Sequence, residues 1–203
     1  MSNCLETDKS FDSSFFSEND DENAERISTD CNEKEQESVI GKATNKNWKI
    51  LKNVIFVCES LINANKKEEN YNEKLNRQKH SKFNGKNIPK ISINDYIERI
   101  FDYCEIEQYN TISALIYIDR LNINSNIILS EYNIHRLIFI CILASIKFNS
   151  DTVYDNKYYA QVAGLSTDEL FELETEFYKN IHFDLYITED EYENYLKYMT
   201  SKE

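Results

Sequence analysis

The chain has 203 residues, three glycines, one proline, five cysteines and a formal net charge of −13 at pH 7. This length allows one domain with a substantial hydrophobic core, and the scarcity of glycine and proline disfavours β-sandwiches and doubly wound folds, whose turns need them. The acidic balance also disfavours nucleic acid as a partner.

The cysteines stand at positions 4, 31, 58, 104 and 141, with no closely spaced pair. This spacing predicts neither a disulfide framework nor a zinc ribbon, and no metal or other cofactor is expected. The opening residues contain no basic segment followed by an apolar one, so no secretion signal is predicted. An intracellular location, in the nucleus or the cytoplasm, is the expectation.

Residues 1–43 have the composition of an acidic, disordered tail. Twelve acidic and three basic residues lie within 1–40, a net charge of −9, and the scattered apolar residues bury too little surface to offset the entropy of ordering. A flexible leader is the plain interpretation. A regulatory tail is the alternative, because several serines lie near acids and are candidate phosphorylation sites: Ser10, Ser13, Ser14, Ser17 and Ser28.

An amphipathic helix is expected over residues 44–65, with Thr44 as its N-cap. Its apolar stripe recurs at helical spacing: Trp48, Leu51, Ile55, Cys58 and Ile62. Residues 66–88 are then polar, with scattered lysines and arginine. This composition predicts a solvated linker, and a targeting signal is the alternative.

Two helices follow the linker. Ser92 with Asp95 three residues later is typical of a capping box, and an apolar stripe runs from Ile93 to Cys104. A second helical pattern extends over residues 108–122. No convincing period-two strand pattern occurs in the chain, so the predicted fold class is all-α.

A buried helix is expected over residues 130–149, because Leu137–Ile146 is a run of apolar residues with Ser145 as its only polar member. Ser130 is a plausible cap, and Lys147 follows the apolar run directly. The segment is too short and too closely flanked by charge to span a bilayer, which needs about 20 apolar residues, so no membrane partner is expected. We interpret it as the central helix of a helical domain.

Three shorter helices complete the pattern. Residues 156–163 form the first, and Gly164 suits the left-handed position just past a helix end. Ser166 with Glu169 forms a capping box for the next helix, and Thr188 with Glu191 forms another for a last helix over 188–203.

Several blocks of residues resemble the cyclin box of the P/U-type cyclins, the group related to the fungal phosphate-signalling cyclin. The blocks follow the family's order and spacing over about residues 48–195, which is far more specific than any one block. They are Phe83, Gly85, Pro89, Ile91–Ile93 and Asp95–Ile100; Tyr117–Arg120; Asn133–Leu137; Ala144, Lys147 and Phe148; Asn156, Tyr158–Ala160, Val162 and Gly164–Ser166; and Leu173, Glu174, Phe177, Phe183 and Leu185.

The resemblance implies a single five-helix cyclin box, residues 89–187, with one extra helix before it and one after it. It also implies a regulatory subunit that does no chemistry and binds a cyclin-dependent protein kinase as a heterodimer, positioning the αC helix of that kinase. Lys147 and Glu174 match the two polar kinase-contacting positions of the family. Asp151, in the loop after the central helix, lies where such a cyclin meets the arginine cluster of the activation loop.

Each of these residues also has a structural interpretation. Lys147 is a cation suited to the end of its own helix, Glu174 is one acid in an acid-rich helix, and Asp151 is an ordinary loop acid. Asp119 is expected to form a buried, fold-maintaining pair with Arg99. His135 is expected to be packed or hydrogen bonded, because no second ligand lies at metal spacing.

The sequence departs from the family pattern at two places, and two other functions must be weighed against kinase regulation. Ala163–Gly164 replaces the two glycines usual in the family, and the animal-type substrate-docking patch is not visible in Asp95–Arg99. No G-x-G-x-x-G, P-loop or nucleophile elbow occurs, so a catalytic function is not expected. The stronger alternative is a cyclin-box scaffold or transcription-type adaptor that activates no kinase.

Overall fold

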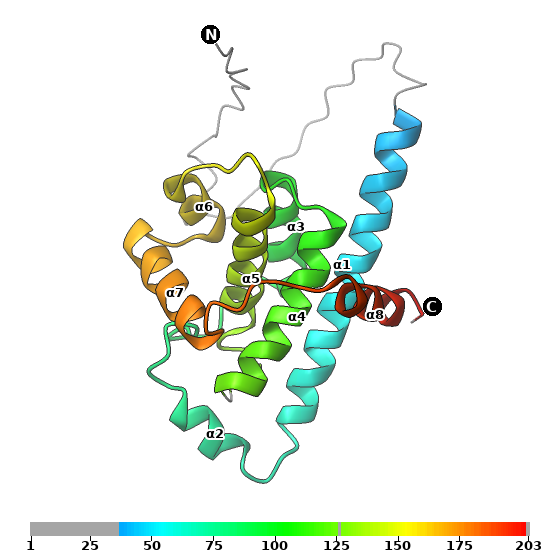
Figure 1. Ribbon diagram of the computed structural model, residues 1–203. Helices are drawn as coiled ribbons and strands as arrows, with labels where there is room; N and C mark the ends of the chain where they lie inside the picture. The colour runs from blue at the N-terminus through cyan, green and yellow to red at the C-terminus, as the bar shows by residue number, and fades with distance from the viewer. Residues whose placement is uncertain (1–36, 126, 202–203) are drawn as a thin grey trace, which may run out of the picture. The chain divides into compact units, whose positions relative to one another are not determined.

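The computed structural model describes residues 37–125 and 127–201, and within these ranges the chain is all-helical (Figure 1). The all-α prediction is confirmed. Residues 1–36 of the predicted acidic tail, 1–43, lie outside the described residues. The helices are α1 Glu37–Asn65, α2 Tyr71–Arg77, α3 Ile93–Tyr103, α4 Gln108–Ser125, α5 Ile134–Asn149, α6 Asn156–Ala163, α7 Thr167–Asn180 and α8 Glu189–Thr200.

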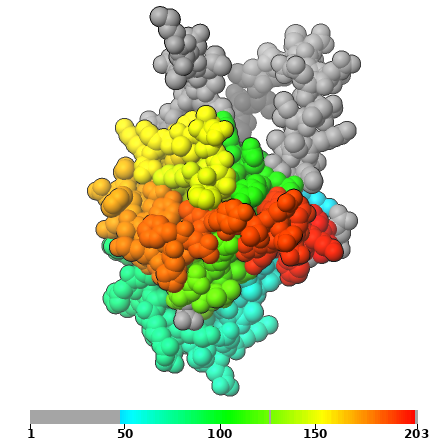
Figure 2. Space-filling view, in the orientation of Figure 1, coloured from blue at the N-terminus to red at the C-terminus, as the bar shows by residue number. Residues whose placement is uncertain are grey.

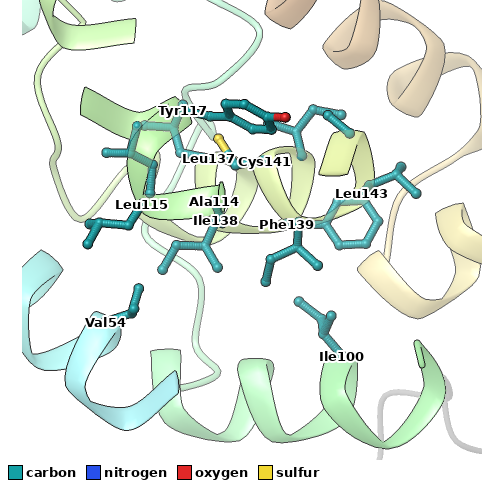
Figure 3. Close-up of a cluster of buried hydrophobic side chains, with 14 of the residues drawn as sticks. Val54, Ile100, Ala114, Leu115, Tyr117, Leu137, Ile138, Phe139, Cys141 and Leu143 are labelled. Atoms are coloured by element: carbon teal, nitrogen blue, oxygen red, sulfur yellow. The ribbon is translucent and has the colours of Figure 1, made fainter. Parts of the chain in front are cut away.

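Helix α5 lies at the centre of these helices and packs against α3, α4 and α7 (Figure 1). Every side chain of Leu137–Ile146 is buried, as the largely apolar run predicts. Figure 3 shows this helix directing its side chains toward those of α1, α3 and α4. Each such large apolar side chain contributes about 1.5–3 kcal/mol on burial, so this helix is the main source of core stability.

The start of α5 differs from the prediction. The N-cap is Asn133, three residues after the expected cap Ser130, and Ser130 lies just before the preceding turn. The Asn133 side chain accepts a hydrogen bond from Ser130 N (2.8 Å) and donates one to Ile128 O (2.9 Å). The asparagine amide therefore holds the turn before the helix, which a serine hydroxyl is too short to do on both sides.

The predicted caps of the helices after α5 are present, although one of the two capping boxes is incomplete. Ser166 and Glu169 make both hydrogen bonds of a capping box, and Gly164 adopts φ +69° after α6. Thr188 accepts a hydrogen bond from Glu191 N (3.2 Å), but the Glu191 side chain binds Arg120 instead of completing the box. These termini orient α6, α7 and α8 around the core.

Helix α1 begins at Glu37, seven residues before the predicted N-cap Thr44, which lies inside the helix. Residues 37–43, predicted as tail, are thus helical, because extending an existing helix by a residue costs much less than nucleating one. The C-terminal half of α1 packs against α3, α4 and α8. Trp48 is half-buried, with its ring 5.5 Å from that of Phe101 in an edge-to-face arrangement.

The polar segment 66–88 is ordered, in contrast to the predicted solvated linker. It contains α2 and then a strap, residues 78–85, that lies on the box. The Gln78 side chain makes two hydrogen bonds with the backbone of Ile128, both 3.1 Å, and Lys82 N donates to Glu176 at 2.8 Å. Phe83 is completely buried. The polar composition of this segment does not predict that it is ordered, because the residues that anchor it lie far away in the sequence.

No helix in the described part of the chain is long and apolar enough to cross a membrane.

Candidate functional site

Three polar side chains from three helices meet at one end of α5. Lys147 lies in the last turn of α5, Asn156 begins α6, and Glu174 lies in the middle of α7. Lys147 Nζ donates to Glu174 Oε1 at 2.5 Å and to Asn156 Oδ1 at 2.6 Å, and Asn156 Nδ2 donates to Glu174 Oε2 at 3.2 Å. We call this closed triangle the polar network.

The network is largely buried but reaches the surface. The Glu174 side chain is 10% exposed and that of Lys147 is 23% exposed. An ammonium has three donors and a carboxylate about four acceptor positions, so the bonds within the network leave one Lys147 N–H and further Glu174 lone pairs. Charge-assisted hydrogen bonds of this kind are short and directional. The network therefore presents a donor and an acceptor whose positions are set before any partner arrives.

Aromatic side chains, most of them exposed, lie close to the network residues along α5 and α7 and just after α7. Phe148 follows Lys147, and Phe171 and Tyr178 lie one turn before and one turn after Glu174 on α7. Phe148 is 52% exposed, Phe171 66% and Phe183 72%. We call Phe148, Phe171, Tyr178 and Phe183 the aromatic rim. Figure 2 shows α6 (yellow) and α7 (orange) side by side, with the segment after α7 running on toward α8.

Phe183 of the aromatic rim lies in the segment that follows α7. His182 and Phe183 have φ of +55° and +57°, a left-handed conformation that is uncommon for residues other than glycine. Phe183 nevertheless stacks on Tyr178, with ring centroids 6.0 Å apart and planes at 7°. Its outer face stays open to solvent. Strain of this kind often marks a functional position.

The structure brings Lys147 and Glu174 together and leaves Asp151 apart. Asp151 is exposed in the loop between α5 and α6, with no ion pair or hydrogen bond to another described residue. Asn156 completes the network and was not predicted as a functional residue. The signal for it was weak, since an Asp–Asn pair before a short helix suggests a cap, and Asp155 is indeed the N-cap of α6.

The predicted pair between Asp119 and Arg99 is wrong. Asp119 Oδ2 instead accepts a hydrogen bond from the Tyr195 hydroxyl at 2.8 Å, and Arg99 lies over the ring of Tyr96 at 5.1 Å. The two residues diverge because Asp119 faces α8, whereas Arg99 on α3 lies beside Gly164 at the end of α6. The cation next in sequence, Arg120, binds Glu191 at 2.7 Å.

His135 is packed and hydrogen bonded. Its Nε2 lies 3.1 Å from Ile91 O, and its ring contacts that of Tyr96 at 5.1 Å. Burial lowers the pKa of His135. The neutral imidazole is therefore favoured, as suits a residue of the core.

The described residues offer little for catalysis or metal binding. They contain no group of three or more His, Cys, Asp or Glu residues placed to hold a metal ion. Burial raises the pKa of both Cys58 and Cys104 to about 12, so neither thiol forms a reactive thiolate near neutral pH. The network and its rim offer hydrogen-bonding groups and exposed apolar surface.

Comparisons with known proteins show the family of this chain. The cyclin family model matches residues 48–185, most of the chain, and the chain therefore belongs to the cyclin family. Within that family it is a cyclin of the P/U type, as its relatives show. They include Cyclin-U4-3 of Arabidopsis thaliana, Cyclin-P4-1 of Oryza sativa subsp. japonica and the PHO85 cyclin-like protein psl1 of Schizosaccharomyces pombe.

The identities are 41% over 120 residues for Cyclin-U4-3, 36% over 123 residues for Cyclin-P4-1 and 36% over 115 residues for psl1. These alignments cover 59%, 60% and 56% of this chain. They cover 55%, 58% and 47% of the respective relatives, so the similarity spans about half the length of each relative.

Proposed function

We propose that this chain is the regulatory subunit of a cyclin-dependent serine/threonine protein kinase, which it binds as a heterodimer and activates. The chain itself catalyses no reaction in this proposal. The observation that carries it is the preformed polar network of Lys147, Asn156 and Glu174 inside an exposed aromatic rim. The names of two relatives support it, since they refer to cyclins of PHO85.

The proposed mechanism is positional. A kinase of this class is active only when the glutamate of its αC helix pairs with the lysine of its ATP site. Lys147 Nζ donates to a main-chain carbonyl near the αC helix, and Glu174 accepts from a main-chain N–H. Because Asn156 already holds both groups, little conformational entropy is lost on binding, and the kinase helix is drawn to a fixed position.

The aromatic rim supplies the apolar part of the interface. Binding hot spots are enriched in aromatic residues that surround and desolvate polar contacts. Phe148 adjoins Lys147 on α5, Phe171 lies one turn from Glu174 on α7, and Phe183 follows α7; each is more than half exposed in the free chain. Covering them removes apolar surface from water and strengthens the buried polar contacts.

Asp151 takes a separate role in this proposal. It is an exposed acid in the loop that joins two helices of the network, α5 and α6. A carboxylate there binds the arginine cluster of the kinase activation loop in place of a loop phosphate, since guanidinium groups pair with both anions in the same bidentate manner. Asp151→Asn should therefore leave kinase binding largely intact and reduce activation of a kinase whose loop is unphosphorylated.

The experiment is co-expression of the full chain with cyclin-dependent kinases, co-purification, and phosphorylation of a generic serine/threonine substrate. Glu174→Ala should abolish co-purification and activity. Glu172→Ala is the matched control, because Glu172 lies on the same helix and forms an exposed ion pair with Lys82. Equal kinase binding and activation by both variants would refute the proposed interface.

The alternative is a scaffold that binds without activating. It predicts stable co-purification with a kinase whose activity does not rise. The exposed rim alone is compatible with both functions, and the activity measurement separates them.

A further inference from the structure

A second site lies between α1, α4 and α8, and it shares no residue with the polar network. These helices pack side by side, with α8 lying across the other two (Figure 1). Between them is a groove of about 390 Å³. That volume lies within the range of about 300–1,000 Å³ typical of ligand-binding pockets. We call it the Asp119 groove.

Each helix lines the groove with residues about one turn apart. Helix α1 contributes Val57 and Leu61, and α4 contributes Leu115 and Asp119. Leu115 is buried beneath the groove, whereas Leu61 is 37% exposed at its edge. On the other side stands Tyr198 of α8, which is 50% exposed. The groove thus has a largely apolar floor, and among the described residues that line it the Asp119 carboxylate is the only charged group.

That carboxylate is only partly satisfied. Asp119 Oδ2 accepts a hydrogen bond from Tyr195, and no cation among the described residues pairs with the side chain. Arg120 points instead to Glu191 and to the carbonyls of Asp184 and Tyr186. Burial raises the pKa of Asp119, and the hydrogen bond from Tyr195 lowers it by less.

We infer that the Asp119 groove binds a peptide segment of a partner protein that carries one arginine or lysine between apolar residues. The basic side chain lies along the floor and meets the free lone pairs of Asp119, while its apolar neighbours cover Leu61 and Tyr198. The charge of the groove selects this occupant over an acidic or a purely apolar one, because an apolar occupant leaves the carboxylate buried and unpaired. Asn194 offers a further hydrogen-bonding group at the same edge.

The test uses the full chain and three probe peptides of sequence acetyl-Gly-Leu-X-Leu-Gly-amide, with X as arginine, citrulline or glutamate. Citrulline keeps the size and hydrogen-bonding shape of arginine and removes its charge. Two-dimensional NMR titration to 5 mM should show saturable shifts of groove resonances with the arginine peptide. Its affinity should exceed that of the citrulline peptide about tenfold, as for loss of a charge-assisted hydrogen bond.

Protein variants complete the cycle. Asp119→Asn keeps the acceptor for Tyr195 and should bring the arginine peptide down to the affinity of the citrulline peptide. Leu61→Ser should weaken all peptides that bind, whereas Ile123→Ser, at an exposed position outside the groove, should change nothing. Circular-dichroism melting confirms that each variant is folded. No binding at 5 mM, or equal affinity for the arginine and citrulline peptides, would overturn the inference.

Discussion

Two carboxylates, the buried Glu174 and the half-buried Asp119, have opposite surroundings in this one fold. Glu174 is held by an ammonium and an amide from two other helices, whereas among the described residues Asp119 has a single hydroxyl donor and no cation. A satisfied carboxylate keeps a fixed position and serves as a preformed contact. A carboxylate without a cation is destabilising until a partner supplies one. The same residue type can therefore mark two different kinds of binding surface, according to the partners that the fold provides.

The largest expected effect concerns kinase binding through the satisfied acid. Lys147→Ala and Glu174→Ala should each weaken binding by about 2–5 kcal/mol, because truncating one member of a buried polar contact leaves the others unpaired. Lys147→Arg should be tolerated only in part, since a planar guanidinium places its donors differently from an ammonium. Isothermal titration calorimetry with the purified kinase measures these differences. Unchanged affinity in the double variant would exclude the network from the interface.

The next effect concerns the stability of the free chain. Lys147→Ala leaves Glu174 with Asn156 alone, and we expect the free energy of unfolding to fall by about 2 kcal/mol. The loss stays below that of a fully buried pair because Lys147 reaches solvent. Adding Glu174→Ala to this variant should cost less than the same change in the wild type. Urea unfolding followed by circular dichroism tests this, and strictly additive losses would contradict a coupled network.

For the unsatisfied acid, Tyr195→Phe removes its single described hydrogen-bond donor. The free energy of unfolding should fall by about 1 kcal/mol, since water that enters the groove replaces part of the lost bond. Tyr192→Phe is a matched control on the same helix, because the Tyr192 hydroxyl accepts from Gln108 rather than binding a carboxylate. Equal losses in the two variants would show that the charge of Asp119 has no part in the effect.

The smallest effect is a pH dependence. The pKa of Asp119 is raised in the folded chain, so between its unfolded and folded pKa values the native state binds more protons than the unfolded state. The stabilisation that this proton provides is present at acidic pH and is lost as the pH rises through the folded pKa. Asp119→Asn should therefore gain stability relative to the wild type on going from pH 3 to pH 7, by roughly 0.5 kcal/mol or less after solvent screening. A relative loss over that range would show that the anion is stabilised in the fold.

Local signals in the sequence were enough to predict most of the fold. The apolar run of α5, the capping box at Ser166 and the glycine after α6 each act within a few residues, and the structure confirms them. The strap was missed because Gln78 and Phe83 are ordered by partners on distant elements. Sequence composition records the polarity of such a segment and not its partners.

The same limit explains the candidate sites. Lys147 and Glu174 were singled out through the family resemblance, but their mutual contact and the part played by Asn156 depend on how three helices meet. The pairing of Asp119 was predicted wrongly because spacing along α4 does not fix which neighbouring helix that residue faces. Only the packing of α8 against α4 brings Tyr195 to it.

Site-specific photocrosslinking tests the central claim most directly. Benzoyl-phenylalanine replaces one of two exposed residues. Phe148 adjoins the network, whereas the control position, Ile123, lies in the last turn of α4. The full chain, co-expressed with cyclin-dependent kinases, is irradiated, and crosslinked peptides are identified by mass spectrometry. If the polar network lies in the kinase interface, crosslinks should form from position 148 to the αC region of a kinase small lobe and none from position 123. Kinase crosslinks from position 123 alone, or none from position 148 in a purified complex, would contradict it.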